Sequence, residues 1–146
     1  MPRERKEGRE LEEEIQRKYI QLQVLKQQLN AMVEEKVLLD SKTNELMVTA
    51  SALKKLPEVK DGQEIWSTLG SGAFVKADIK DTESVMVEIG AGVYIRKKLE
   101  EALKILQTRL NEMEKLNDDL LSEINKFSQQ ISRLEPELER LIQESR

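Results

Sequence analysis

The sequence contains no cysteine and no histidine. Those two absences exclude disulfides, thiolate nucleophiles, the commonest zinc ligands and the usual general base near neutral pH. Carboxylates and lysines can still support catalysis, so an enzyme is the weakest of the functions considered rather than an excluded one. We therefore expect no catalytic residues, no metal site and no cofactor.

Aromatic and other apolar residues are also scarce. Aromatic residues make up 3% of the chain and hydrophobic residues 38%, against 36% charged residues, which is thin material for one large core. Apolar runs stay far below the roughly 20 residues needed to cross a bilayer, and the first residues lack the apolar segment of a signal peptide. The sequence thus predicts a soluble, cytoplasmic protein without a membrane partner.

The formal net charge is −4, and the sequence lacks the basic stripe that nucleic acids require, so nucleic acid is not an expected partner. Two glycine pairs, Gly70-Ser71-Gly72 and Gly90-Ala91-Gly92, do not continue into a phosphate-binding motif and do not open a helix. We interpret both as turns.

From Leu11 onward, apolar residues recur at alternating intervals of three and four, the a/d pattern of a coiled coil. One run extends to Leu53 and a second from Leu99 to Leu141. Because a lone helix with such a stripe is unstable, we expect the two arms to pair in antiparallel fashion. Facing residues would have numbers that sum to 149 or to 156, and the sequence does not choose between these registers. Polar residues interrupt this a/d seam and are expected to set its register at some cost in stability: Lys18, Lys36, Thr43 and Asn117.

The free ends of both arms are expected to lie together at a tip. Residues 1–9 should be frayed or disordered, and Pro136 should kink or restart the second helix after Glu135. Tyr19, Ile20, Val24 and Ile142 are apolar but lie outside the seam. They are either ordinary scattered surface residues or a soft patch for exposed hydrophobic segments of other proteins.

Between the arms, apolar residues recur at every second position, which predicts strands at Ile65–Leu69, Ala73–Ile79, Val85–Ile89 and Val93–Arg96. The expected organisation is a disordered N-terminus over 1–9, a first helix over 10–56, a β insert over 57–98 and a second helix over 99–146. One strand face is mostly polar but carries four large apolar side chains, namely Trp66, Phe74, Met86 and Tyr94.

Four strands are too few to close a barrel, so the insert has open edges. We expect inserts from several chains to pair into one shared β body, from which the arms project. The alternative is that the arms fold back and cover the sheet.

The two hairpin stretches, Leu69–Ile79 and Val85–Ile95, resemble those of prefoldin, an ATP-independent holdase chaperone, and two hairpins rather than one mark its alpha class. The resemblance covers nearly the whole chain. The family often has Pro where Thr68 stands here. The resemblance implies a hexamer of two alpha-class and four beta-class subunits with a joint double β-barrel. It also implies tips that hold nonnative client proteins and pass them to a group II chaperonin.

The sequence therefore predicts an α+β fold, a long two-helix antiparallel coiled coil with a four-stranded insert that oligomerises into a shared β-barrel. It predicts a chaperone subunit that works without ATP. The alternative is a structural spacer that tethers fixed partners. We assign client binding to Leu11, Ile15, Tyr19, Ile20, Leu138 and Ile142. We assign assembly contacts to Trp66, Phe74, Val75, Met86, Val87 and Tyr94.

Overall fold

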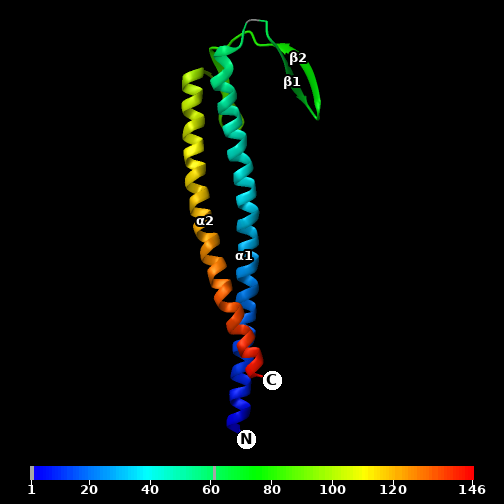
Figure 1. The fold of residues 1–146 in the computed structure, drawn as a ribbon, viewed down its shortest axis with the longest axis vertical. Coiled ribbons are helices and arrows are strands. Elements are labelled where there is room, and N and C mark those ends of the chain that lie inside the picture. Colours follow the sequence, from blue (N-terminus) through cyan, green and yellow to red (C-terminus); the bar gives the residue numbers. More distant parts are fainter. Residues whose placement is uncertain (1, 61) are drawn as a thin grey trace. The chain divides into compact units, whose positions relative to one another are not determined.

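The computed structural model describes residues 2–60 and 62–146, and over these ranges the chain forms two long helices and two β-hairpins (Figure 1). This confirms the predicted α+β class, a helical pair with a β-hairpin insert. In chain order the elements are α1 (Pro2–Lys55), a 3₁₀ turn η1 (Leu56–Glu58), β1 (Glu64–Gly70), β2 (Ala73–Asp78), β3 (Ser84–Gly90), β4 (Val93–Lys98) and α2 (Leu99–Glu144).

Both ends of α1 and the course of α2 at Pro136 differ from, or refine, what the sequence predicts. Helix α1 is helical from Pro2, whereas residues 1–9 were expected to be disordered; proline suits the first helical turn, and Glu4 complements the positive end of the helix dipole there. Met1 lies outside the described residues. At the other end, Pro57 converts the last turn of the arm into η1. The prediction that Pro136 makes the second helix kink or restart after Glu135 is wrong as to the restart, because α2 runs through Pro136.

The chain divides into two compact units, which are described separately. The terminal unit comprises residues 2–40 and 115–146, and the hairpin unit comprises residues 41–60 and 62–114. In the terminal unit α1 and α2 lie side by side (Figure 1) and enclose a core formed by Leu22, Leu25, Leu134 and Leu138. Ile15, Phe127 and Ile131 pack against this core.

Along both helices, burial is concentrated at the positions that the heptads assign to the seam. Each predicted seam residue is buried or half-buried, while most of the positions between them are exposed. Two contacts choose the register that the sequence left open. The Thr43 hydroxyl donates to the Met113 sulfur at 3.7 Å, and these residue numbers sum to 156. In the terminal unit Lys18 reaches Glu137, which is next to Leu138, the residue that faces Lys18 in the same register. In the terminal unit, this register leaves residues 2–9 of α1 without α2 opposite them, which explains their full exposure.

Two polar seam residues have distinct surroundings. Lys18 reaches Glu137 on α2 at 3.2 Å and Glu14 on its own helix at 3.5 Å, so its charge is paired. Among the described residues, the Oδ1 atom of Asn117 is the buried side-chain oxygen that finds no hydrogen-bond partner. An unsatisfied oxygen costs stability, as expected for a polar residue at a seam.

Each hairpin is a separate two-stranded antiparallel sheet, β1 with β2 and β3 with β4. The turns are alike. Ser71 and Gly72 have φ values of 53° and 81°, and Ala91 and Gly92 have 50° and 74°. Two successive positive φ values are the mark of the tight turn that suits the twist of a hairpin, so both glycine pairs are turns, as predicted. A bulge follows Thr68 in the first hairpin and Glu88 in the second.

Candidate assembly and binding surfaces

The terminal unit places the six predicted client-binding residues in three different environments. Leu138 is 6% exposed and belongs to the core, while Leu11 and Ile15 are half-buried seam residues. Tyr19 and Ile20 are well exposed, and Ile142 is 37% exposed. The side chains available without any opening of the helical pair are therefore these last three, which we call the tip surface.

Residues Tyr19 and Ile142 of the tip surface lie on the same edge of the helical pair. Lys26 and Glu135 form a salt bridge of 2.8 Å across that edge, and each is exposed. Tyr19 lies seven residues before Lys26, and Ile142 lies seven residues after Glu135. Because seven residues return to the same side of each coiled-coil helix, Tyr19 stands opposite Ile142 on the edge that the salt bridge marks.

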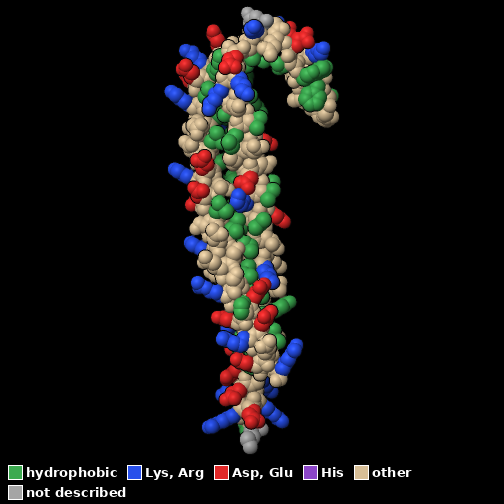
Figure 2. All heavy atoms as spheres, in the orientation of Figure 1, with side chains coloured by type: hydrophobic (Ala, Val, Ile, Leu, Met, Phe, Trp, Pro, Cys, Tyr) green, Lys and Arg blue, Asp and Glu red, His purple; other side chains and the backbone are tan. Residues whose placement is uncertain are grey.

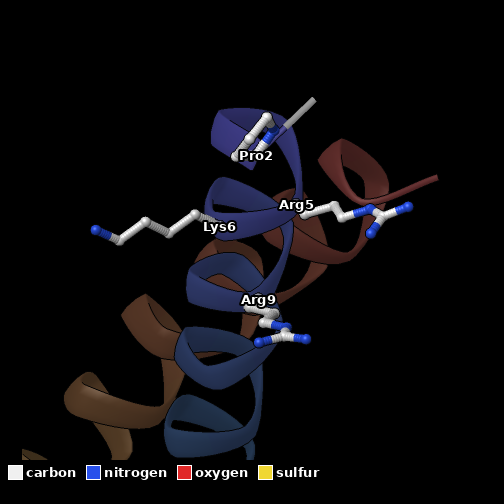
Figure 3. Close-up of a pocket in the computed structure, with 4 residues that line it drawn as sticks. All are labelled: Pro2, Arg5, Lys6 and Arg9. Carbon is white, nitrogen blue, oxygen red and sulfur yellow. The ribbon is translucent and has the colours of Figure 1, made fainter.

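Basic side chains surround the first turns of α1 in the same unit. Figure 3 shows Arg5 and Lys6 pointing to opposite sides of the helix, and Arg9 one turn further along it. Because Arg5 and Lys6 diverge, these two cations cannot meet the same anion.

Figure 2 shows that hydrophobic side chains also lie on the visible surface of α1 and on the hairpin β1–β2, while charged side chains prevail near the chain termini. Along α1 the exposed apolar residues outside the tip surface are Val24, Val33, Val37, Leu38, Met47 and Val48. Isolated exposed apolar residues are normal, and these provide matched controls for substitutions at the tip surface.

The hairpin unit exposes four of the predicted assembly residues on equivalent sites of the two hairpins. Trp66 pairs across its sheet with Lys76 as Met86 pairs with Arg96, and Phe74 occupies the place that Tyr94 has in the second hairpin. All four apolar side chains are more than half exposed. We call Trp66, Phe74, Met86 and Tyr94 the hairpin surface.

Charged neighbours order part of the hairpin surface. The Lys76 ammonium lies 5.4 Å from the centre of the Trp66 ring, within the range of a cation–π contact, and 3.8 Å from Glu64. These contacts hold Lys76 over the indole in the single chain.

The remaining two predicted assembly residues behave differently from each other. Val75 is 45% exposed, whereas Val87 is 8% exposed within this one chain. On α2, Ala102 is fully buried and Ile105 is half-buried although neither is a seam residue. Arg109, one turn further on, donates a hydrogen bond from Nη2 to the Glu88 carbonyl of β3. The second hairpin is thus bonded to α2, and Val87 offers little free surface.

Sequence reasoning did not identify this attachment. The signal was present as apolar Ala102 and Ile105 outside the seam, followed by Arg109 on the same side of the helix. One face of β3 is thus partly buried within the single chain, and its backbone is bonded to α2. Most of the residues of β1–β2 are exposed on both faces.

Asp81, in the linker between the hairpins, is the described group with a clearly displaced pKa. Its carboxylate accepts hydrogen bonds from the Ser84 hydroxyl at 2.5 Å, the Glu83 N–H at 2.8 Å and Arg96 at 2.8 Å. These donors, with Ser84 foremost, hold the pKa of Asp81 well below its usual range.

Over residues 2–60 and 62–146, no group of three or more acidic, histidine or cysteine side chains is placed to hold a metal ion. Within the same ranges, neither helix has a stretch apolar enough to traverse a bilayer.

The chain is similar to known proteins over most of its length. A family model described as Prefoldin subunit matches residues 25–144. The prefoldin subunit alpha of Methanococcus vannielii is 32% identical over 130 residues, which cover 89% of this chain and 87% of the relative. That of Archaeoglobus fulgidus is 27% identical over 127 residues, which cover 87% and 93%.

Two solved structures share the fold. The cryo-EM structure of filamentous PFD from Methanocaldococcus jannaschii aligns with a TM-score of 0.68 at 23% identity, over 79% of this chain and 95% of that chain. The crystal structure of the prefoldin beta subunit from Thermococcus strain KS-1 aligns with a TM-score of 0.56 at 16% identity, over 87% and 90%. At these identities the likeness concerns the fold alone.

Proposed function

This chain belongs to the prefoldin family as an alpha-class subunit, and from that premise we propose that it holds nonnative proteins without ATP and passes them to a group II chaperonin. Membership of this family makes it a chaperone subunit that assembles with other prefoldin subunits. The observation that carries the proposal is the tip surface, where Tyr19, Ile20 and Ile142 are exposed at the free ends of the helices.

We propose that client capture is the burial of apolar surface on both sides. Each exposed side chain of the tip surface offers apolar area worth about 25 cal/mol per Å² when it leaves water, so a single tip binds weakly. Several tips in one assembly would bind one client together, because a second contact within an assembly is intramolecular. Release needs no nucleotide, since each contact is weak and reversible.

Three of the predicted client-binding residues are buried or half-buried, and in this proposal they contact a client only when the helices open. Leu11, Ile15 and Leu138 would reach a client only where the ends of the helices separate. They contribute to the tip surface indirectly, by holding α1 and α2 together beneath it.

Assembly through the hairpins is the second part of the proposal. An isolated two-stranded sheet is marginally stable in water, and its unpaired edges invite other strands. The hairpin surface and the strand edges would pair with beta-class subunits in a hexamer of two alpha and four beta chains that shares a double β-barrel. Val75 would join this contact, and Val87 would support it from within the chain.

The proposal includes no cofactor, no membrane and no nucleic acid, and it places the assembled chaperone in the cytoplasm. A specific spacer that tethers one folded partner is the competing function, and it predicts saturable binding to that partner rather than to unfolded proteins.

The test is a dilution of guanidinium-denatured citrate synthase into buffer without ATP, followed by light scattering. The chain, assembled with a beta-class prefoldin subunit, should suppress aggregation. The variant Tyr19→Ser/Ile20→Ser/Ile142→Ser should lose most of that suppression. The matched control Val37→Ser/Leu38→Ser/Val48→Ser removes exposed apolar side chains elsewhere on α1 and should keep it. Failure of the assembled wild-type chain would favour the spacer.

A further inference from the structure

Three side chains at the base of the second hairpin form a closed set of hydrogen bonds. The Asp81 Oδ2 atom accepts from the Ser84 hydroxyl at 2.5 Å and from Arg96 Nη2 at 2.8 Å. Arg96 Nε in turn donates to the Ser84 hydroxyl oxygen at 2.9 Å. We call Asp81, Ser84 and Arg96 the Asp81 clasp. It joins the linker between the hairpins to the first residue of β3 and to β4.

The backbone around the clasp is bonded as well. The Asp81 Oδ1 atom accepts from the N–H groups of Glu83 at 2.8 Å and Ser84 at 3.3 Å. The Glu83 carbonyl accepts from the N–H of Leu99 at 2.9 Å, the first residue of α2, whose N–H has no partner within the helix. Residues 81–84 are therefore attached to β3, to β4 and to the start of α2.

Among the described residues, the strands of the first hairpin are bonded to each other but not to a helix or to the second hairpin. Strand β2 ends at Asp78, so only Ile79 and Lys80 lie between it and the clasp. Most of the residues of β1 and β2 are exposed on both faces. At the end of β2, the first hairpin is thus joined to the clasp by only two linker residues. This short connection limits how far the hairpin can move relative to the clasp.

We propose that Asp81 is a positioning residue for assembly: the clasp orders the linker in the free subunit, so that the two hairpins meet partner subunits in one arrangement. Binding costs less when a segment is ordered beforehand. The inference rests on the proposed assembly through the hairpins and adds the residue that prepares it.

The clasp lies on the surface, and this separates its role from general stability. The Asp81 and Arg96 side chains are both exposed, and exposed ion pairs contribute little to global unfolding. Arg96 also stands across from Met86 of the hairpin surface, so a direct contact between Arg96 and a partner subunit is the competing explanation.

The test compares the assembly of wild-type chain and Asp81→Asn with a beta-class subunit by analytical ultracentrifugation. Asparagine keeps one oxygen for the Glu83 and Ser84 N–H groups but turns an NH₂ group toward Arg96, which can only donate. We expect the association constant for assembly to fall about tenfold, which lies within the range of interaction free energies measured between residues in contact. The thermal unfolding midpoint of the helices should be unchanged. Asp78→Asn removes the same charge three residues earlier and should assemble normally.

A double-mutant cycle with Arg96→Gln separates the two explanations. If Asp81 acts by holding Arg96, the double variant assembles about as well as either single variant. Hydrogen exchange at the Glu83 and Ser84 amides of the free subunit should then be faster in Asp81→Asn. Independent, additive losses would assign Arg96 to a direct contact and overturn the proposal. Normal assembly of Asp81→Asn would overturn it too, as would a lowered helix midpoint. Failure of the wild-type chain to assemble would instead refute the proposed hairpin assembly.

Discussion

Arg109 on α2 donates a hydrogen bond to the backbone carbonyl of Glu88 on β3, and this bond attaches one of two otherwise similar hairpins to the helix. The neighbouring Val87 is buried, whereas the first hairpin exposes most of its residues. The two hairpins therefore differ in their surroundings. The second is bonded to α2 within the single chain, and most residues of the first are exposed.

Replacing Val87 by alanine should reveal this difference. Val87→Ala removes two buried methyl groups, each worth about 0.8 kcal/mol, so we expect a loss of roughly 1–2 kcal/mol in the free energy of opening the second hairpin. Val75→Ala, on the exposed first hairpin, should change stability by less than about 0.5 kcal/mol. Native-state hydrogen exchange of the strand amides measures both. Equal effects would contradict the attachment.

Substitutions at the tip should distinguish residues of the core from residues that bind clients. Leu138→Ala creates a cavity in the core of the terminal unit, and we expect it to lower the free energy of unfolding by about 2–5 kcal/mol in urea titrations followed by circular dichroism. Ile142→Ala should leave that free energy nearly unchanged but weaken suppression of aggregation. If Ile142→Ala unfolds the helices as readily as Leu138→Ala, then Ile142 belongs to the core rather than to the tip surface.

The aromatic residues of the first hairpin should dominate assembly. Large aromatic side chains at the centre of an interface contribute about 2 kcal/mol or more each, so Trp66→Ser/Phe74→Ser should weaken association by roughly several hundredfold. Native mass spectrometry of the chain with a beta-class subunit would show the lower assembled mass. Leu38→Ser/Val48→Ser, two exposed apolar residues on α1, is the control, and an unchanged mass for the Trp66/Phe74 variant would remove these residues from the interface.

The carboxyl group of Asp81 should stay ionised in acid. Its folded pKa is depressed below the ordinary value of about 3.9, so the clasp contributes in full above that value and is lost as the pH falls through the folded pKa. Slow hydrogen exchange near the linker should persist below pH 4 in wild-type chain and be absent in Asp81→Asn. A carbon-13 titration of the Asp81 carboxyl provides the direct measurement, and an ordinary pKa would show that the clasp does not form in solution.

Much of this structure was predictable because its largest elements repeat a simple pattern. The seam from Leu11 to Leu141 follows from heptad spacing, and the hairpin turns follow from two glycine pairs at which φ is positive. The register needed contacts such as that of Thr43 with Met113, because a shift by one heptad leaves the apolar pattern unchanged. The burial of Val87 within the single chain could not be predicted from the sequence. The alternation of apolar residues along β3 is the same whether a helix or another chain covers that face.

The helix ends were less predictable, for a related reason. Residues 2–9 have no seam partner and carry no heptad pattern, so the apolar spacing does not predict a helix there. Their helical form reflects local features such as Pro2 and Glu4. Pro136 lies opposite the seam, where the packing of Leu134 and Leu138 on α1 holds the helix on both sides of it. Tertiary packing thus outweighs the local preference of proline to end a helix.

Site-specific photo-crosslinking tests the central claim most directly. A photoreactive phenylalanine analogue replaces Tyr19 in one variant and Val48 in another, and each is assembled with a beta-class subunit and mixed with guanidinium-denatured citrate synthase without ATP. Both positions are exposed on α1, so they differ in location rather than in accessibility. We predict strong crosslinking to the denatured client from position 19 and little from position 48. Equal yields, or crosslinks to folded citrate synthase that match those to the denatured form, would contradict client holding at the tip surface.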